Sequence, residues 1–544
     1  MLQPYMQIAD PVAHSLALSS FFALLPLLVM FVLLGGLKWS PLLSGVCALI
    51  VAMAVAVLAY GMPVSATVHS ALFGAAFSIL NVIFIVIDAI WIHNMLVKSG
   101  YFDVVRRTFA VVSSDLRLQA ILIAFCFGGL LEALAGAGTP IAIVAVMLVA
   151  LGMNPLKAVV CALVADTAPV AFGALAVPVV TLAQVTNQPF NLLGAIIGRQ
   201  TPVLAVVVPF VLVWIVDGRR GLKHVWPAAL TAGLAFGVAQ FVCSNYISVP
   251  LSDILASLVG AAAMVALSQV WKPSEAMETR PAASAAAEIK DAERDSLRDR
   301  LRDRVIAFMP YMLIVAVFVI AQIPAVAGWL NVGLVKVAWP GLAIQTAAAK
   351  AANTTLSLPL ISGAATLLLI AGILAAPLLR VSAGDAVRVY GQTLYQMRMF
   401  VPTVFAVLAV AFVMNFSGQA ATLGTWLAGA GQAFAFLSGA IGWVGVAITG
   451  SDNSSNALFG ALQATAANKA GLSPALLGAA NSSGGVLGKM ISPQSLVIGA
   501  AAVGITGREG DIFRACLVWS VVLMLALCLL VYFQSTPVLS WMLP

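Results

Sequence analysis

Charged side chains are scarce in this sequence. Only 9% of its 544 residues are Asp, Glu, Lys or Arg, and 62% are hydrophobic, whereas soluble globular proteins carry about 25% charged residues. Apolar runs of roughly 20 residues, enough to cross about 30 Å of hydrocarbon, recur along the chain. Residues 399–451 contain no Lys, Arg, Asp or Glu at all. We therefore expect an all-α, polytopic membrane protein with about 11 to 13 transmembrane helices.

Groups that hold metals, nucleotides or reaction intermediates are also scarce. The six cysteines and four histidines are dispersed, without a CxxC pair, which argues against metal and redox sites. Gly488-Lys489 lacks both the first glycine and the final Ser or Thr of a phosphate-binding loop. We expect neither an enzyme nor a cofactor, because no nucleophile and base are paired. The net charge of +7 is explained by basic cytoplasmic loops rather than by nucleic acid.

Basic residues gather in a few loops and predict the orientation of the chain. Residues 1–15 contain no Lys or Arg, so they do not form the basic start of a secretory signal. Clusters of Lys and Arg lie in residues 98–117, 219–223, 272–304 and 380–398. Cytoplasmic loops carry an excess of Lys and Arg in membrane proteins. We therefore place these four segments in the cytoplasm and both termini outside.

A shift of 319 residues aligns the two halves of the chain. Gly152-Met-Asn-Pro155 then overlies Gly471-Leu-Ser-Pro474, and the basic segments 98–117 and 380–398 overlie segments without Lys or Arg. Opposite charge in matched loops is what inverted repeats produce, although chance matches of Gly and Pro produce weak alignments as well. We predict a first transmembrane repeat at 1–216, two connecting transmembrane helices at 217–271, a charged cytoplasmic linker at 272–304 and a second transmembrane repeat at 305–544.

Gly, Pro and polar residues interrupt the apolar pattern at equivalent places in the two halves. The first half is interrupted at 132–140 and 165–169, and the second at 449–456 and 481–495. Gly and Pro break helices and leave backbone groups without partners. Lipid cannot satisfy those groups, so unwound backbone at membrane depth must be buried in protein or line a cavity. Broken or re-entrant helices at matching positions indicate the binding site of a transporter.

The polar residues at these interruptions suit a small carboxylate. Half-helix N-termini offer free amides and positive dipole ends, and hydroxyl and amide side chains add donors. Lys489 lies among apolar residues and is the candidate for a fixed positive charge; the alternative is a helix-end lysine that reaches the membrane surface. The predicted substrate-binding residues are Gly138, Thr139, Ser451, Ser454, Ser455, Asn456, Asn481, Ser482, Ser483 and Lys489.

Three acidic residues lie in apolar surroundings beside the interruptions: Glu132, Asp166 and Asp452. An ionised carboxylate is costly in a bilayer, and such residues commonly mark ion or proton pathways. We assign all three to proton coupling, since no metal-binding cluster of acids accompanies them. The alternative is a structural acid that pairs with a buried lysine or a backbone amide. Asp88 is a further candidate and is expected to pair with His93 near a helix end.

Five stretches carry a likeness to a known family. They are Gly450-Ser-Asp-Asn-Ser-Ser-Asn-Ala-Leu-Phe459, Leu462-Gln-Ala-Thr465, Ala480-Asn-Ser-Ser-Gly-Gly-Val-Leu-Gly-Lys-Met-Ile-Ser-Pro-Gln-Ser495, Glu132-Ala-Leu-Ala-Gly-Ala-Gly-Thr-Pro140 and Asn415-Phe-Ser-Gly418. With the number of spans, they resemble the bacterial L-lactate permease family over most of the chain outside the linker. The resemblance implies secondary uptake of L-lactate, D-lactate or glycolate with protons across the inner membrane.

One residue departs from the pattern expected of that family: Asn453 stands where we expect a threonine. No substrate contact is carried over from the resemblance, so the predicted site rests on the physical argument above. We predict a proton symporter for a small 2-hydroxy monocarboxylate, surrounded by lipid, with no nucleic-acid partner and with its oligomeric state open. A sodium-coupled carrier of another small carboxylate is the alternative, because unwound carbonyls with Ser and Asn also suit sodium. Paired broken helices in inverted repeats favour alternating access over a channel.

Overall fold

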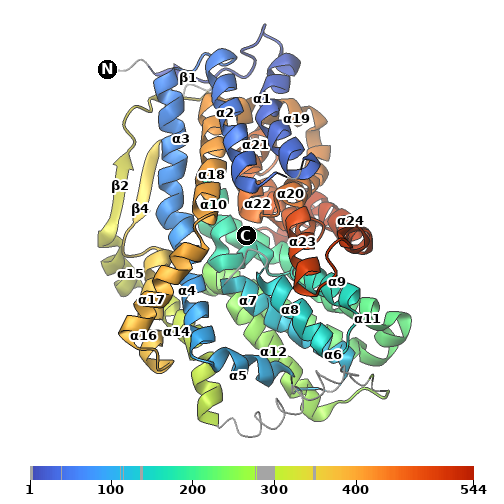
Figure 1. Ribbon diagram of the computed structural model, residues 1–544. Helices are drawn as coiled ribbons and strands as arrows, with labels where there is room; N and C mark the ends of the chain where they lie inside the picture. Colours follow the sequence, from blue (N-terminus) through green and yellow to red (C-terminus); the bar gives the residue numbers. More distant parts are fainter. Residues whose placement is uncertain are drawn as a thin grey trace.

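Helices dominate the computed structural model, which describes the chain outside several gaps (Figure 1). Apolar segments form helices in a bilayer because each helix satisfies its own backbone N–H and C=O groups. The prediction of an all-α, polytopic membrane protein is confirmed. Most of the predicted 272–304 linker lies outside the described residues. The residues that are not described are 1–3, 38, 111, 114, 135–138, 276, 278–300 and 347–350.

Helices in the first part of the chain begin at local signals in the sequence. A capping side chain followed by proline opens two of them: Ser40 with Pro41, and Asn154 with Pro155. Proline suits the first turn because its missing N–H would have no helical partner there. In chain order these helices are α1 (Leu16–Phe31), α2 (Pro41–Leu58), α3 (Val64–Ser78), α4 (Phe84–Lys98), α5 (Tyr101–Ala110), α6 (Leu116–Gln119), α7 (Gly128–Leu134), α8 (Thr139–Ala150), α9 (Pro155–Ala165), α10 (Gly173–Thr186), α11 (Phe190–Val242) and α12 (Ser252–Val270).

Helices in the second part of the chain often end at a left-handed glycine. Gly418, Gly450 and Gly471 follow three of them with φ of 94°, 73° and 70°, a conformation that glycine adopts without steric cost. In chain order these helices are α14 (Leu301–Gln322), α15 (Pro324–Leu330), α16 (Ala364–Leu378), α17 (Ala383–Gln396), α18 (Phe400–Ser417), α19 (Gln419–Leu427), α20 (Phe434–Thr449), α21 (Asp452–Ala470), α22 (Pro474–Lys489), α23 (Pro493–Ala502) and α24 (Glu509–Gln534).

Short strands, which the sequence did not lead us to expect, lie at one side of the bundle (Figure 1). β2 (Leu334–Ala338) and β4 (Thr355–Pro359) pair antiparallel. β1 (Tyr5–Met6) and β3 (Ile344–Gln345) pair in parallel. The N-terminal segment is also held to the end of α18, because the Gln7 amide donates to the carbonyl of Asn415 over 2.9 Å.

Ten helices are long and apolar enough to cross a membrane, or eleven if the bent pair of α9 and α10 forms one span. This number of spans, taken over the described residues, reaches the lower end of the predicted range. α11 is counted once, yet Gly218 breaks it with φ of 61°. Its two halves pack side by side, since a Cβ on Gly233 would lie 2.8 Å from the Cα of Val206. The second half of α11 and α12 occupy the segment at 217–271 for which we predicted two connecting helices.

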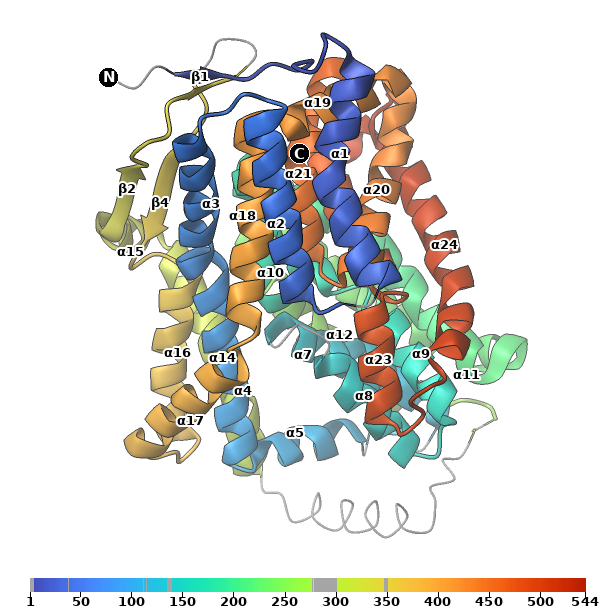
Figure 2. The same ribbon diagram turned by 45° about the horizontal axis from the view of Figure 1, so that its top comes forward.

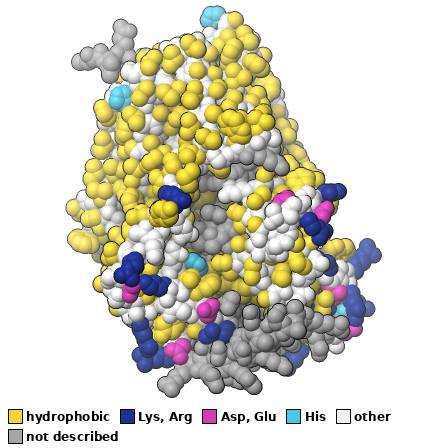
Figure 3. Space-filling model, in the orientation of Figure 1, with side chains coloured by type: hydrophobic (Ala, Val, Ile, Leu, Met, Phe, Trp, Pro, Cys, Tyr) yellow, Lys and Arg dark blue, Asp and Glu magenta, His cyan; other side chains and the backbone are white. Residues whose placement is uncertain are grey.

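Charged side chains gather toward the lower part of the face drawn in Figure 3, and hydrophobic side chains cover most of its upper part. Two exposed ion pairs belong to loops predicted to be cytoplasmic. Lys98 Nζ lies 2.7 Å from Asp385, and Arg220 pairs with Glu275. The hydrogen bond from Lys98 lowers the pKa of Asp385 below its usual value, so this pair is retained at neutral pH. The orientation of the chain in the membrane stays a prediction.

Helices at a spacing of 319 residues correspond in their order and in the residues at which they begin. Pro155 opens α9 and Pro474 opens α22, while α11 begins at Phe190 and α24 at Glu509. Helices related in this way lie toward opposite ends of the molecule: α5 is low and α19 is high in Figures 1 and 2. This arrangement supports the inverted repeat, which remains a prediction.

Candidate transport site

The first interruption separates α7 from α8 and α9 from α10. α7 ends at Leu134 and α8 begins at Thr139. The predicted site residue Gly138 lies outside the described residues, and only the backbone of Thr139 is described. α9 ends at Ala165, and the chain bends by 59° before it continues in α10. The prediction of a broken helix is confirmed here.

Three consecutive residues at the start of α10 have a left-handed backbone. Ala174, Leu175 and Ala176 have φ of 45°, 55° and 62°. This conformation costs L-residues roughly 1–2 kcal/mol each. Such strain persists where the surrounding structure holds it, and it clusters at functional sites. The surrounding structure therefore maintains the break between α9 and α10, which follows Asp166 and includes Gly173.

The second interruption lies between α20 and α21 and again between α22 and α23. Gly450 ends α20, and Ser451 caps α21 by accepting a hydrogen bond on Oγ from the backbone N–H of Ser454 over 3.3 Å. α22 ends at Lys489, and Ser492 caps α23. The first turn of α21 thus presents backbone amides and the positive end of the helix dipole.

Residues from both interruptions line one cavity of about 390 Å³. Figure 3 shows the molecule hollowed near the middle of the face that it draws. The lining is mainly apolar where α1, α4 and α18 contribute, with Thr403 of α18 as the exception, and it is polar at the two interruptions. The polar lining residues are Glu132, Thr403, Thr449, Ser451, Asp452, Asn453, Ser454, Lys489 and Gln494.

Lys489 forms a buried cluster with two of the predicted acids. Its Nζ lies 2.7 Å from Glu132 Oε1 and 2.8 Å from Asp166 Oδ2. The three side chains are only 6%, 4% and 4% exposed in that order. The lysine therefore does not extend to the membrane surface, and it is not a free cation either. Pairing with a buried lysine is the alternative that we gave for these acids. It joins Lys489, which we predicted to bind the substrate, to Glu132 and Asp166, which we predicted to couple protons.

Close packing of α20 against α22 fixes the position of Lys489. A Cβ on Gly484 would lie 2.1 Å from the carbonyl oxygen of Gly439, and one on Gly488 would lie 2.2 Å from that of Trp443. Small residues allow membrane helices to approach this closely. Because Lys489 follows Gly488 directly, the helix contact holds its backbone while its side chain extends to Glu132 and Asp166.

Asp452 is the third predicted acid, and it lies apart from the cluster in the lining of the same cavity. Its Oδ2 accepts hydrogen bonds from Ser482 Oγ over 2.5 Å and from Asn456 Nδ2 over 3.3 Å. Its Oδ1 has no hydrogen-bond partner among the described residues. Asp452 is also the first residue of α21, where the helix dipole favours a negative charge.

Only some of the predicted substrate-binding residues face the cavity. Ser451, Ser454 and Lys489 line it. Ser455, Asn456, Asn481 and Ser482 are fully buried and form a hydrogen-bonded network behind α21; in it, Asn481 Nδ2 donates to Asn456 Oδ1 over 2.9 Å. Ser483 is buried as well. None of these five residues lines the cavity, and their part in substrate binding stays a prediction.

Several lining residues were missing from the predicted site. Asn453 faces the cavity, and Thr181 Oγ1 donates to its Oδ1 over 2.5 Å. Gln494 lies in the Ser492–Ser495 segment that we had recognised as an interruption, so its position was a usable signal. The apolar lining from α1 and α18, such as Met30 and Phe400, carries no such signal, because those residues read as ordinary membrane helix.

The predicted pair of Asp88 and His93 does not form. Both residues are buried in α4, but a spacing of five residues points their side chains to different faces of the helix. Asp88 has Tyr390 of α17 as its polar neighbour, and the His93 ring packs edge-on against Phe102 at 5.1 Å. The expectation was wrong because it used closeness in sequence without the helical period.

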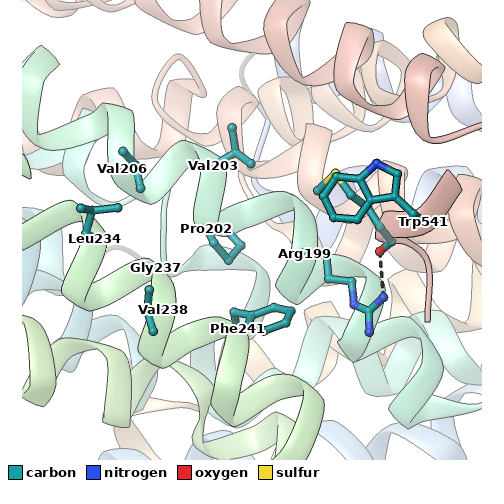
Figure 4. Close-up of a pocket in the computed structure, with 10 residues that line it drawn as sticks. Arg199, Pro202, Val203, Val206, Leu234, Gly237, Val238, Phe241 and Trp541 are labelled. Carbon is teal, nitrogen blue, oxygen red and sulfur yellow. Dashed lines mark hydrogen bonds between the residues drawn. The ribbon is translucent and has the colours of Figure 1, made fainter. Parts of the chain in front are cut away.

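Another cavity in the described part of the chain, of about 730 Å³, has polar lining residues such as Asn81, Gln184 and Asn191, but none of its lining residues is charged. Among the described residues, no group of three or more His, Cys, Asp or Glu side chains is placed to hold a metal ion. A further cavity of about 450 Å³ lies between the halves of α11 and the C-terminal residues (Figure 4). Its lining is apolar except for Arg199, whose Nη1 donates to the carbonyl of Met542 over 2.9 Å. It contains none of the predicted site residues.

Known membrane permeases match the chain along its whole length. The model of the L-lactate permease family matches residues 19–538. The chain is 37% identical to the L-lactate permease of Bacillus subtilis (strain 168), with 99% of each chain covered. It is 37% identical to the L-lactate permease of Escherichia coli (strain K12), with 98% of each covered, and 38% identical to the glycolate permease GlcA of the same strain, with 92% of each covered. The cavity, the broken helices and these matches agree, and the chain belongs to the L-lactate permease family of transporters.

Proposed function

We propose that this protein imports L-lactate, and also D-lactate and glycolate, by proton symport across the bacterial inner membrane. One observation carries the proposal: a single buried lysine is shared by two acids beside the cavity. The names of the relatives, L-lactate permease and glycolate permease, support the substrate class. These substrates are small 2-hydroxy monocarboxylates, which one cation and a few hydrogen-bond donors suffice to recognise.

The substrate carboxylate would lie between Lys489 and the first turn of α21. The dipole at that helix end supplies roughly half a positive charge, and Ser451 and Ser454 bring hydroxyl donors to the same wall. Asn453 would meet the 2-hydroxyl, since its amide faces the cavity and is held by Thr181. The apolar lining from α1 and α18 suits the methyl group of lactate.

Proton coupling follows from competition for Lys489. Glu132 and the substrate present the same chemical group, a carboxylate, to the same ammonium. With Glu132 and Asp166 both ionised, the cluster carries a net negative charge and repels an anion. Protonation of Glu132, which lines the cavity, removes that charge and frees Lys489 to bind the substrate, while Asp166 keeps the lysine in place. One proton thus offsets the charge of one monocarboxylate.

Asp452 modulates the same event. An ionised Asp452 beside the α21 terminus opposes an anion in the cavity, and its free Oδ1 is able to hold a proton. Amide variants separate the two acids. Glu132→Gln should still exchange lactate across the membrane but no longer accumulate it with a pH gradient, whereas Asp452→Asn should raise lactate affinity.

Uptake into proteoliposomes tests the proposal. Purified protein should accumulate labelled lactate and glycolate when the interior is made alkaline, and an imposed sodium gradient at equal pH should drive none. The matched control is Asp385→Asn, which removes an exposed acid far from the cavity and should retain uptake. Accumulation driven by sodium and indifferent to pH would favour the sodium-coupled carrier and refute proton symport.

The proposed orientation places both termini outside and the 272–304 linker inside. It rests on the basic loops and on the charged end of the molecule. A single cysteine introduced in the linker should resist a membrane-impermeant thiol reagent added to intact cells, while one introduced at Gln3 should react. The reverse pattern would invert the orientation.

A further inference from the structure

Asp253 is a buried acid that the transport site described above does not use. It is the second residue of α12 and is completely buried. Its Oδ1 accepts a hydrogen bond from Gln240 Nε2 over 2.8 Å, and its Oδ2 has no hydrogen-bond partner in the described part of the chain. Sequence analysis did not single it out, because it lies at the start of an ordinary apolar helix.

Asp253 lies on the face of α12 that packs against α7, the helix that carries Glu132. α12 packs closely on α7, since a Cβ on Gly129 would lie 2.7 Å from Ser257 Oγ. Ser257 is one turn along α12 from Asp253, and Glu132 is one turn along α7 from Gly129. The charged groups that act on Asp253 are Glu132 and Asp166.

Gln240 connects Asp253 to the broken helix. Its Nε2 donates both to Asp253 and to the carbonyl of Ala168 over 3.2 Å, and Ala168 belongs to the turn between α9 and α10. Thr201 Oγ1 donates to Gln240 Oε1 over 3.0 Å, which fixes the amide with its N–H groups toward Asp253. A movement of the turn therefore changes how much of the Gln240 donor is left for Asp253.

No cation compensates Asp253 within the described chain. The titratable groups that face it are Glu132 on α7, Asp166 after α9 and the Cys243 thiol after α11, and none of them is positively charged. Lys489 is already shared by two acids. An ionised carboxylate without an ion partner costs several kcal/mol in such surroundings, so Asp253 carries a proton in this conformation.

We propose that Asp253 binds a second transported proton, which it gains and releases as the turn between α9 and α10 moves, so that two protons accompany each monocarboxylate. The proposal rests on the proton symport proposed above. In the release step the O–H bond at Asp253 Oδ2 breaks, and an O–H bond forms on the Glu132 or Asp166 carboxylate, from which the proton leaves through the cavity. No electron is transferred. Asp253 takes up a new proton by the reverse path in the opposite conformation.

Stoichiometry is the measurable consequence. Two protons and one anion carry a net charge of plus one, so transport responds to membrane voltage, whereas one proton and one anion are neutral. Since one charge gains about 2.3 kcal/mol per 100 mV and about 1.4 kcal/mol is tenfold, an inside-negative potential of about 60 mV should raise lactate accumulation about tenfold. Each pH unit should raise it about a hundredfold with two protons and about tenfold with one.

The experiment measures equilibrium accumulation of labelled lactate in proteoliposomes with imposed voltage and pH gradients. Wild type should respond to voltage, and Asp253→Asn, which preserves the shape of the side chain, should lose that response and follow pH about tenfold per unit. The control Asp385→Asn should behave as wild type.

Wild-type uptake that follows pH but not voltage would overturn the second proton alone, and this result does not depend on how well the variant folds. Equal voltage dependence in wild type and Asp253→Asn would overturn the role of Asp253. Wild-type uptake that ignores pH would instead overturn proton symport itself.

Discussion

Replacing Lys489 by methionine tests how the buried cluster balances its charges. The change removes the ammonium that lies 2.7 Å from Glu132 and 2.8 Å from Asp166 and leaves two buried acids without a cation. Removing one partner of a buried ion pair costs about 3–5 kcal/mol. Lys489→Met should therefore lower the free energy of unfolding by about that amount. It should also weaken lactate binding by roughly 10- to 100-fold, the value of a charge-assisted hydrogen bond of about 1.5–3 kcal/mol.

A second variant separates the charge from the packing. Lys489→Met combined with Glu132→Gln and Asp166→Asn carries the same methionine but no orphaned acid, so it should recover most of the lost stability while it still fails to bind lactate tightly. Lys489→Arg should recover only part of the binding, because the guanidinium is larger and planar. Denaturant unfolding and lactate titration of the purified variants provide both numbers. A Lys489→Met protein with wild-type stability and wild-type affinity would refute the balance of charges that we describe.

The remaining predictions concern the walls of the cavity and the exposed loops. Ser482→Ala removes the 2.5 Å hydrogen bond to Asp452 and should lower stability by about 1–3 kcal/mol in denaturant unfolding, with lactate binding changed through Asp452. Gly442→Ala should fail to fold or unfold at much lower denaturant, because the new Cβ would lie 1.9 Å from the carbonyl oxygen of Asn481; Gly429→Ala, with nothing within 4 Å, is its neutral counterpart. Acidification through the lowered pKa of Asp385 protonates it and breaks its exposed pair with Lys98. The stability contributed by that pair is thus present at neutral pH and lost only in acid, and Asp385→Asn should abolish this acid dependence while uptake at neutral pH is unchanged.

The membrane fold was readable from the sequence because lipid constrains it strongly. Long apolar runs must become helices, and Gly and Pro at 165–169 and 449–456 marked where those helices break. The strands at Leu334–Ala338 and Thr355–Pro359 were not predicted, since a strand of five residues in a mainly apolar region is hard to tell from the end of a span. The division of α11 at Gly218 was also marked, by the basic residues at 219–223, and it lies beside the boundary that we predicted between residues 216 and 217.

The site was only partly readable. Composition alone selected Glu132, Asp166 and Lys489 as unusual in apolar surroundings, but it could not tell that they contact one another, because the contact joins residues 357 positions apart. Serines and asparagines in one interruption looked equivalent, yet helix phase turns Ser454 toward the cavity and buries Asn456 behind it. Which polar group faces the substrate depends on how the helices pack, and the local sequence does not determine that packing.

Proton uptake on lactate binding tests the central claim, that one lysine is exchanged between an acid and the substrate. Purified protein in weakly buffered solution is mixed with lactate at pH 6 to 8, where lactate is ionised, and the pH change and the affinity are measured together. Wild type should take up at least one proton per lactate and bind more tightly as the pH falls. Glu132→Gln should bind with less proton uptake and a flatter pH dependence. Lactate binding by wild type without proton uptake, with an affinity that does not change over this pH range, would contradict the account.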